Sequence, residues 1–347
     1  TRLRLNSLTG AYSAGNVITA FRGEGKFEYI FGAPGEAEVE REVGAAIRAA
    51  KVKYDLRRLK MISIGHTPQG FGFGRALDAE MMSTFGTTLD SIEARELINK
   101  AKGYTEEELA DELAEARKTI VGLEAIPENN VVNFARLYKA YKSYVGENHI
   151  GALCSRCWPD FFTEFGTPVC SVLSLLNANG VSASCESDAY GALSMFIGSD
   201  LTSRSCFFGD PVSMNEKEGT ITFWHCGMAA CDLARKDTGA QVGVHPNRKI
   251  GPVMDFGCEA CEHVTIFRVG RKPDGSFRFF IAEGSALDKP KQFNGTSVVV
   301  KTVESAKDVV YGTVKGGWEP HFVVVYGQVA NELEKLGNML GVEVCKF

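Results

Sequence analysis

Short strand patterns recur through the second half of the chain, and they constrain its fold more than any other feature. After Gly151, runs rich in β-branched and aromatic residues follow one another, separated by turn residues such as the PDGS stretch at 273–276. The runs are residues 169–176, 205–209, 220–226, 263–270, 277–284 and 296–302. They predict a β-rich carboxy-terminal domain over residues 151–347.

The first part of the chain follows a different pattern, in which a strand leads through a loop into helices. Residues 59–64 form a short apolar strand pattern, and the GFGFG stretch at 70–74 indicates a tight turn. An amphipathic helix is expected over 128–145. This order is typical of an α/β domain, which we place at residues 51–150. Residues 1–50 end in a helical pattern, and we interpret them as the end of an incomplete amino-terminal α/β domain.

Charge and composition exclude several classes of partner. The formal net charge is -5, so the chain offers no basic face to nucleic acid or to an anionic membrane surface. No apolar run approaches the roughly 20 residues that cross a bilayer, and the start of the chain lacks a signal layout. The ten cysteines are scattered, many in apolar strings, as in proteins of a reducing compartment. We therefore expect a cytoplasmic protein that acts on a small neutral or polar ligand.

Two carboxylates in apolar surroundings are the first candidates for chemistry. Glu186 comes where a strand is expected to end, and Asp210 follows an apolar run at another expected strand end. Asp188 is explained as the cap of a helix that begins near Ala189, whereas Glu186 has no such structural explanation. Each carboxylate alone is also consistent with a purely structural role. Together in an apolar cleft, they would need a proton or a cation as compensation.

His321 is the third candidate. Residues 320–340 are expected to form the last helix, with Pro320 in its first turn. A histidine at a helix amino terminus is kept neutral and ready to bind a metal, although a capped or partly exposed histidine is the alternative interpretation. Two carboxylates and one imidazole suit a divalent cation of the Mn²⁺ or Mg²⁺ kind, with open positions for substrate oxygens.

Two CysXxxCys pairs offer a competing metal site. They are Cys154 with Cys157 and Cys258 with Cys261. Roughly a hundred residues separate the two pairs, unlike the compact spacing of zinc ribbons. Despite this spacing, a zinc-stabilised interaction module with four thiolate ligands is an alternative hypothesis.

Residues 151–347 resemble the carboxy-terminal part of the L-fucose isomerase and L-arabinose isomerase family, especially its shorter L-fucose isomerase-like members. The likeness is carried by RCWPDFF, CESDAYGALSM, FFGDPVSM, HCGMAA, GPVMDF, FIAEGSALD and WEPHFVVVYGQVANEL. Residues 52–150 resemble the family's second α/β domain more weakly. The resemblance implies an α/β fold, in which Rossmann-like α/β domains are followed by a β-rich carboxy-terminal domain that carries the ligands.

The resemblance also implies a metal-dependent aldose–ketose isomerase that works through an enediol. It places the metal ligands on Glu186, Asp210 and His321, and it gives proton transfer to the two carboxylates. The implied cofactor is Mn²⁺, with Mg²⁺ or Co²⁺ as alternatives. We add three residues that are expected to bind the substrate: Arg156, Trp158 and His225.

The resemblance leaves the sugar open: an L-fucose-like sugar, an L-arabinose-like sugar, or a modified hexose such as sulfoquinovose. A sulfonated substrate would need an arginine, for which Arg75 and Arg156 are candidates.

Relatives form trimers or hexamers, so we expect a homo-oligomer with active sites near subunit interfaces. A non-catalytic sugar-binding or regulatory relative is the alternative function. The presence of all three expected ligands argues against it, because a protein without turnover has no need of the metal.

Overall fold

The computed structural model describes residues 7–22 and 27–347. Its helices are α2 (Ser7–Arg22), α3 (Ala37–Leu56), α4 (Asp78–Phe85), α5 (Ala94–Lys102), α6 (Ala110–Thr119), α7 (Glu128–Asn148), α8 (Cys170–Ala178), α9 (Ala189–Thr202), α10 (Ala306–Lys315) and α11 (Ala330–Leu340). Its strands are β1 (Lys60–Ile64), β2 (Thr88–Ile92), β3 (Ile120–Val121), β4 (Ala152–Ser155), β5 (Ser182–Cys185), β6 (Cys206–Asn215), β7 (Thr220–His225), β8 (Ala240–Gly243), β9 (Val253–Met254), β10 (Cys261–Arg271), β11 (Phe277–Ala286), β12 (Thr296–Thr302), β13 (Phe322–Val325) and β14 (Glu343–Lys346).

Four strands form a parallel sheet in the order β2, β1, β4, β5. Every residue of β4 and β5 is buried, as is usual where helices cover both faces of a parallel sheet. The predicted domain boundary after residue 150 falls within this sheet, because β1 and β2 precede it and β4 and β5 follow it. The division of the chain into three domains stays a prediction.

The carboxy-terminal strands form a seven-stranded sheet in the order β10, β13, β6, β7, β12, β11, β14. Strand β10 also pairs with β11, so six antiparallel strands close into a barrel, and β14 joins β11 in parallel. Closure pairs strand edges that would otherwise be exposed. The predicted α/β class with a β-rich carboxy-terminal region is confirmed. A small third sheet joins β3, β8 and β9.

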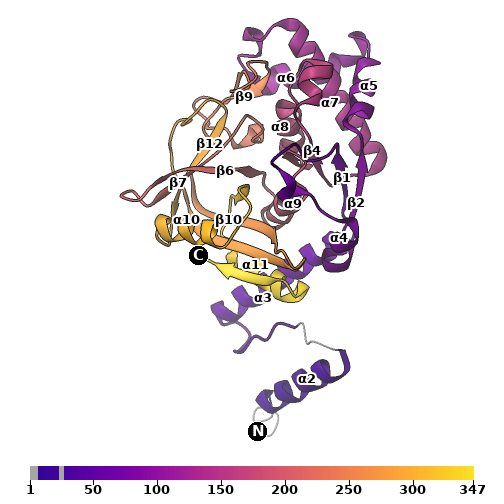
Figure 1. Ribbon diagram of the computed structural model, residues 1–347. Coiled ribbons are helices and arrows are strands. Elements are labelled where there is room, and N and C mark those ends of the chain that lie inside the picture. Colours follow the sequence, from indigo (N-terminus) through magenta and orange to yellow (C-terminus); the bar gives the residue numbers. More distant parts are fainter. Residues whose placement is uncertain (1–6, 23–26) are drawn as a thin grey trace.

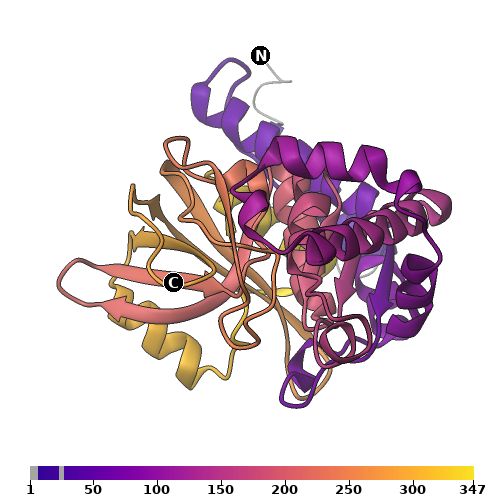
Figure 2. The same cartoon turned by 90° about the horizontal axis from the view of Figure 1, so that it is seen from above.

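Helix α9 joins the two sheets. It contacts β4 and β5 of the parallel sheet and β6, β10 and β13 of the barrel. Figure 1 shows it near the centre of the molecule, and Figure 2 shows the barrel strands on one side and the helices around the parallel sheet on the other. Because partners surround α9, its residues are apolar or small on nearly all sides. The loop that leads into α9 therefore lies where the two sheets meet.

One predicted strand is wrong. Residues 169–176 lie mainly in helix α8, in which Cys170 to Asn177 are all buried. A helix buried on every side has no polar face, so its sequence lacks the helical periodicity that distinguishes it from a buried strand. The other five predicted runs lie in strands β6, β7, β10, β11 and β12.

The last predicted helix is wrong in its first part. Residues Phe322–Val325 form strand β13, which lies between β10 and β6 and is buried throughout. A β-branched run fits a central strand that is covered on both faces. The helix itself begins only at Ala330. Among the described residues, no helix is both long and apolar enough to cross a membrane.

Candidate active site

Four strands each bring one polar side chain to the junction of the two sheets. Glu186 directly follows β5 of the parallel sheet, while Asp210 lies within β6, His225 ends β7 and His321 immediately precedes β13. Strands β13, β6 and β7 are hydrogen-bonded neighbours in the barrel. The site is therefore assembled from both halves of the fold.

Two local predictions about these residues need correction. His321 begins no helix, because a strand follows it, so the helix dipole does not act on its ring. Asp210 lies inside β6 and not at its end, next to a register irregularity between Pro211 and Ser213. Pairing with neighbouring strands, which the local sequence does not reveal, decides both positions.

Close contacts link the four side chains in series, from His225 through Glu186 and His321 to Asp210. His225 Nε2 lies 3.2 Å from Glu186 Oε2, at hydrogen-bond distance. His321 Nε2 lies 3.9 Å from the same Glu186 oxygen and 3.6 Å from Asp210 Oδ1. The ring nitrogen of His321 thus faces both carboxylates that the sequence singled out.

Burial and charge affect the two carboxylates differently. The Glu186 side chain is only 5 % exposed, while that of Asp210 is 33 % exposed. Burial acts to raise the pKa of Glu186, but the neighbouring imidazoles of His225 and His321 lower it to about 2. Burial raises the pKa of Asp210 above its ordinary value, although both histidines oppose the shift. Glu186 is the enclosed anion of the site, and Asp210 is the carboxylate that solvent reaches.

The residues present fit a divalent cation. A hexacoordinate ion with metal–oxygen distances near 2.1 Å places neighbouring donors about 3 Å apart and opposite donors about 4 Å apart. The separations of His321 Nε2 from the two carboxylate oxygens, 3.6 and 3.9 Å, lie in this range. The three donor atoms do not all lie within 4.8 Å of one another, so the two carboxylates must close in around a bound ion. Carboxylate oxygens with one imidazole nitrogen suit Mn²⁺ or Mg²⁺ better than soft metals.

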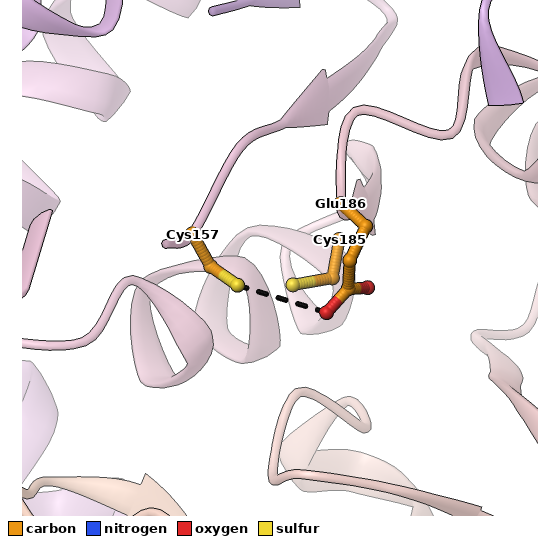
Figure 3. A group of neighbouring side chains, drawn as sticks. All are labelled: Cys157, Cys185 and Glu186. Carbon is orange, nitrogen blue, oxygen red and sulfur yellow. Dashed lines mark hydrogen bonds between the residues drawn. The ribbon is translucent and has the colours of Figure 1, made fainter. Parts of the chain in front are cut away.

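Two groups that include cysteine also surround Glu186. The donor atoms of Cys157, Cys185 and Glu186 lie within 4.8 Å of one another, as do those of Glu186, His225 and Cys226. Figure 3 shows the first group, with Cys157 Sγ 3.6 Å from Glu186 Oε1. The pKa of Cys157 is lowered by a hydrogen bond from Cys185 but raised by burial, to about 12. Without a bound metal, Cys157 is thus a neutral thiol that donates to Glu186 Oε1 and orients this carboxylate.

The zinc hypothesis is wrong for the part of the chain that the structure describes. Within it, both groups of three or more potential metal donors include Glu186. Neither combines Cys154 and Cys157 with Cys258 and Cys261. A shared four-thiolate site is therefore not formed.

The residues predicted to bind substrate lie at different positions. His225 contacts Glu186 directly, and its Nδ1 atom is buried without a hydrogen-bond partner among the described residues. The Trp158 ring contacts the Phe71 ring, which in turn lies 5.8 Å from the His321 ring. Arg156 Nε lies 2.7 Å from an Asp160 carboxylate oxygen. Its charge therefore already has a partner.

Three phenylalanines around His321 were not predicted. The His321 ring lies 5.8 Å from Phe71, 5.3 Å from Phe73 and 4.6 Å from Phe208, measured between ring centroids. Phe71 and Phe73 belong to the GFGFG stretch, whose tight turn is present as a short helical turn at Gly72–Gly74. The sequence does contain a signal for Phe71 and Phe73, because both are aromatic residues in a glycine-rich loop that follows an expected strand.

The loop that carries Glu186 has an unusual backbone. Glu186 and Ser187 both have φ of 53°, in the left-handed region that residues other than glycine rarely adopt. Such residues cost on the order of 1–3 kcal/mol each, and they cluster at functional sites. The Ser187 amide donates to Ser155 O at 3.1 Å, which holds the loop against the parallel sheet. The strained backbone thus lies at Glu186, the residue for which the local sequence offers no structural role.

An α/β sheet joined to a β-barrel, with two carboxylates and an imidazole where they meet, matches the class of sugar isomerase that the sequence resembles. Residues 251–347 match the family model described as L-fucose isomerase, C-terminal domain. A sulfoquinovose isomerase of Clostridium sp. (strain MSTE9) is 62% identical over 342 residues, which cover 99% of this chain and 76% of that protein.

Two further relatives carry the same name. The sulfoquinovose isomerase of Priestia aryabhattai is 41% identical over 343 residues, covering 99% of this chain and 76% of the relative. That of Alkalicoccus urumqiensis is 38% identical over 347 residues, covering 100% of this chain and 77% of the relative. The chain belongs to the L-fucose isomerase-like family, and it is an aldose–ketose isomerase. The alternative of a non-catalytic sugar-binding relative finds no support.

Proposed function

We propose that this protein isomerises sulfoquinovose, a sulfonated hexose, to the corresponding ketose with the help of a divalent cation. The observation that carries the proposal is the position of His321 Nε2, which faces Glu186 and Asp210 at 3.9 and 3.6 Å. The names of the three relatives support the choice of sugar.

We assign the cation to Glu186, Asp210 and His321, with Mn²⁺ as the first choice and Mg²⁺ or Co²⁺ as alternatives. When bound, it would polarise the sugar carbonyl and stabilise the negative charge that develops on the enediol oxygens. The buried Glu186 carboxylate offers a fixed anionic ligand, since Cys157 and His225 hold its two oxygens separately. Asp210 offers a carboxylate that a sugar can reach, since its side chain is one third exposed.

The isomerisation moves one proton from C2 to C1 of the sugar. A carboxylate takes the proton from C2, which leaves an enediol, and returns it to C1, while the carbonyl oxygen gains a proton and the C2 hydroxyl loses one. Glu186 and Asp210 are the proposed carboxylates for this transfer. The better accessibility of Asp210 favours it for the direct contact with the sugar carbon.

His225 is proposed to contact a sugar hydroxyl. Its Nε2 atom is occupied by Glu186, while its Nδ1 atom is buried and has no hydrogen-bond partner in the described part of the chain. A buried polar atom without a partner carries a free-energy cost, which a hydroxyl of the bound sugar would remove.

The sulfonate requires a cationic group near the site, and we propose Arg248. Its guanidinium lies over the Trp158 ring at 5.5 Å and near the Phe162 ring at 6.0 Å. Within residues 7–22 and 27–347, no carboxylate forms an ion pair with it at 4.0 Å or less. Stacking positions an arginine while leaving its N–H edge available to an anion. Arg156, a candidate from the sequence, is engaged by Asp160.

We further propose that the protein is cytoplasmic and forms a homo-oligomer, a trimer or a hexamer, with active sites near subunit interfaces. This part of the proposal follows from the family resemblance. Sedimentation velocity of the purified protein measures the assembly, and a monomer at micromolar concentration would contradict it.

The proposed function is tested by following the conversion of sulfoquinovose by NMR, with protein treated with a chelator and then resupplied with Mn²⁺. We expect turnover to disappear with the metal and to return with it, and L-fucose and L-arabinose to react more slowly. Full turnover by the stripped protein would contradict the metal requirement. Faster turnover of L-fucose than of sulfoquinovose would contradict the substrate.

A further inference from the structure

A buried chain of polar contacts lies behind His321. Asp188 accepts a hydrogen bond from Arg268 Nη1 at 2.6 Å and from Arg268 Nη2 at 3.0 Å. Its Oδ2 atom also lies 2.9 Å from His321 Nδ1. The side chains of Asp188 and Arg268 are both 0% exposed. Arginine, aspartate and histidine thus form a continuous buried network that ends at the candidate metal site.

Capping explains only part of this network. Asp188 caps α9, as the sequence predicts, because its Oδ1 atom accepts the Gly191 amide hydrogen at 2.9 Å. A cap needs only one acceptor atom. A wholly buried arginine is costly to fold, because its charge must leave water. The contact between Oδ2 of Asp188 and His321 gives the buried pair a role beyond capping.

The network determines which nitrogen of His321 carries a proton. A carboxylate held by a two-point contact with an arginine is ionised and can only accept hydrogen bonds. His321 Nδ1 must therefore donate to Asp188, and in the neutral ring Nε2 then has the lone pair. This Nε2 atom is the one that faces Glu186 Oε2 and Asp210 Oδ1.

The orientation of the ring is restricted as well. The Phe71, Phe73 and Phe208 rings all lie within 6 Å of the His321 ring, measured between centroids. Rotation of the imidazole would exchange its two nitrogens, break the bond to Asp188 and disturb these aromatic contacts. Packing and hydrogen bonding therefore favour the same ring position.

We propose that Asp188 and Arg268 are positioning residues that fix the tautomer and orientation of His321 so that Nε2 is ready to bind the cation. This inference rests on the proposed function, because it concerns the same metal site. A partner on the second nitrogen of a histidine ligand raises the basicity of the ligating nitrogen, and its loss typically costs 10- to 100-fold in metal affinity.

The first test compares Mn²⁺ affinity, measured by calorimetry on chelator-treated protein without sugar, for the wild type and Asp188→Asn. The asparagine keeps the shape of the side chain and an oxygen for the Gly191 amide, but it places an amide N–H toward His321 Nδ1. That hydrogen bond favours the opposite tautomer, with the proton on Nε2. We expect the affinity to fall about 10- to 100-fold. Unchanged affinity in a folded variant would overturn the proposal.

Arg268→Lys is the second variant, for the case that Asp188→Asn does not fold. Lysine keeps the charge but not the two-point contact, so we expect a smaller loss of Mn²⁺ affinity than for Asp188→Asn. Far-UV circular dichroism, which reports whether the variant folds, should match that of the wild type. Wild-type affinity in this variant would also count against the proposal. Ser305→Ala serves as the control, because Ser305 caps α10 by accepting from the Asp308 amide and has no part in the site. It should lower thermal stability and leave Mn²⁺ affinity unchanged.

A spectroscopic readout separates this inference from the proposed function. Nitrogen NMR of histidine-labelled, metal-free protein at alkaline pH reports the tautomer of each neutral imidazole. The wild type should carry the His321 proton on Nδ1, and Asp188→Asn should shift it to Nε2. If the wild type binds no divalent cation but carries the proton on Nδ1, and Asp188→Asn shifts it to Nε2, the metal site fails and the role of Asp188 in fixing the tautomer stands. If the wild type carries the proton on Nε2, the positioning role fails whatever the metal does.

Discussion

The imidazole of His225 and the carboxylate of Glu186 lie 3.2 Å apart, and both side chains are almost wholly buried. Glu186 directly follows a strand of the parallel sheet, and His225 ends a strand of the barrel. Their contact therefore joins the two halves of the fold at the candidate metal site. Burial acts to lower the pKa of His225, but the neighbouring Cys226 and the Glu186 carboxylate raise it well above its ordinary value. The two side chains thus meet in a place that water barely reaches.

Replacing Asp210 should abolish most turnover. Asp210→Asn removes the carboxylate proposed for proton transfer and one charged ligand of the cation, so we expect kcat to fall by roughly 10²- to 10⁴-fold. Steady-state kinetics with saturating Mn²⁺ measure the loss. Asp200→Asn is the matched control, because Asp200 is also partly buried but pairs with Lys51 outside the site. Near-normal turnover by Asp210→Asn would remove Asp210 from the mechanism.

Replacing Arg248 should affect sulfonated sugar selectively. Arg248→Gln removes the stacked guanidinium, and a hydrogen bond to a charged group contributes about 1.5–3 kcal/mol. We expect kcat/KM for sulfoquinovose to fall about 10- to 100-fold, while that for quinovose, which lacks the sulfonate, changes little. Arg58→Gln is the control, because Arg58 is also exposed and its guanidinium also lies over an aromatic ring, that of Tyr54 in α3, at 5.5 Å. An equal loss for both sugars would indicate a structural role for Arg248.

Gly74 should tolerate no side chain, whereas Gly72 in the same turn should. A Cβ atom on Gly74 would lie 2.7 Å from the backbone Cα of Asp188, so the turn or the Asp188 loop must move. Overpacking of this kind costs about 1–3 kcal/mol, and we expect Gly74→Ala to lower both the melting temperature and kcat. A Cβ atom on Gly72 would meet nothing within 4 Å, so Gly72→Ala is the matched control. Equal effects of the two variants would contradict this account.

The ion pair between Glu80 and Arg271 should make stability depend on pH. Each Glu80 oxygen accepts a hydrogen bond from Arg271 at 2.7 Å, which joins α4 to β10. The hydrogen bond from Arg271 lowers the pKa of Glu80, which partial burial opposes. The folded-state pKa thus lies below the unfolded value, so the stabilisation is present above the ordinary glutamate pKa and is lost as the pH falls through the folded value.

Denaturant unfolding of the wild type and Glu80→Gln at several pH values measures this contribution. We expect the wild type to be more stable by about 1 kcal/mol at neutral pH, with the difference vanishing in acid. Glu334→Gln removes a surface ion pair with Lys346 and should have a smaller effect. A Glu80 difference that is constant from acid to neutral pH would show that packing, and not charge, stabilises this contact.

The sequence by itself determined the local features of the protein. Strand patterns predicted most of the barrel, and the position of Glu186 after a strand and the cap at Asp188 are both confirmed. These features depend on residues a few positions apart, so a linear pattern contains them. The assignment of Asp210 and His321 to the metal came from the family resemblance and stays a proposal.

Only the tertiary structure decided what surrounds these residues. The apolar runs at 169–176 and 322–325 are buried on all sides, so nothing in their periodicity told helix from strand. The contact of Asp188 with Arg268 and His321 joins residues 80 and 133 positions apart in sequence. A local explanation of Asp188 as a cap was correct but incomplete, because strand pairing in the barrel brings those partners to it.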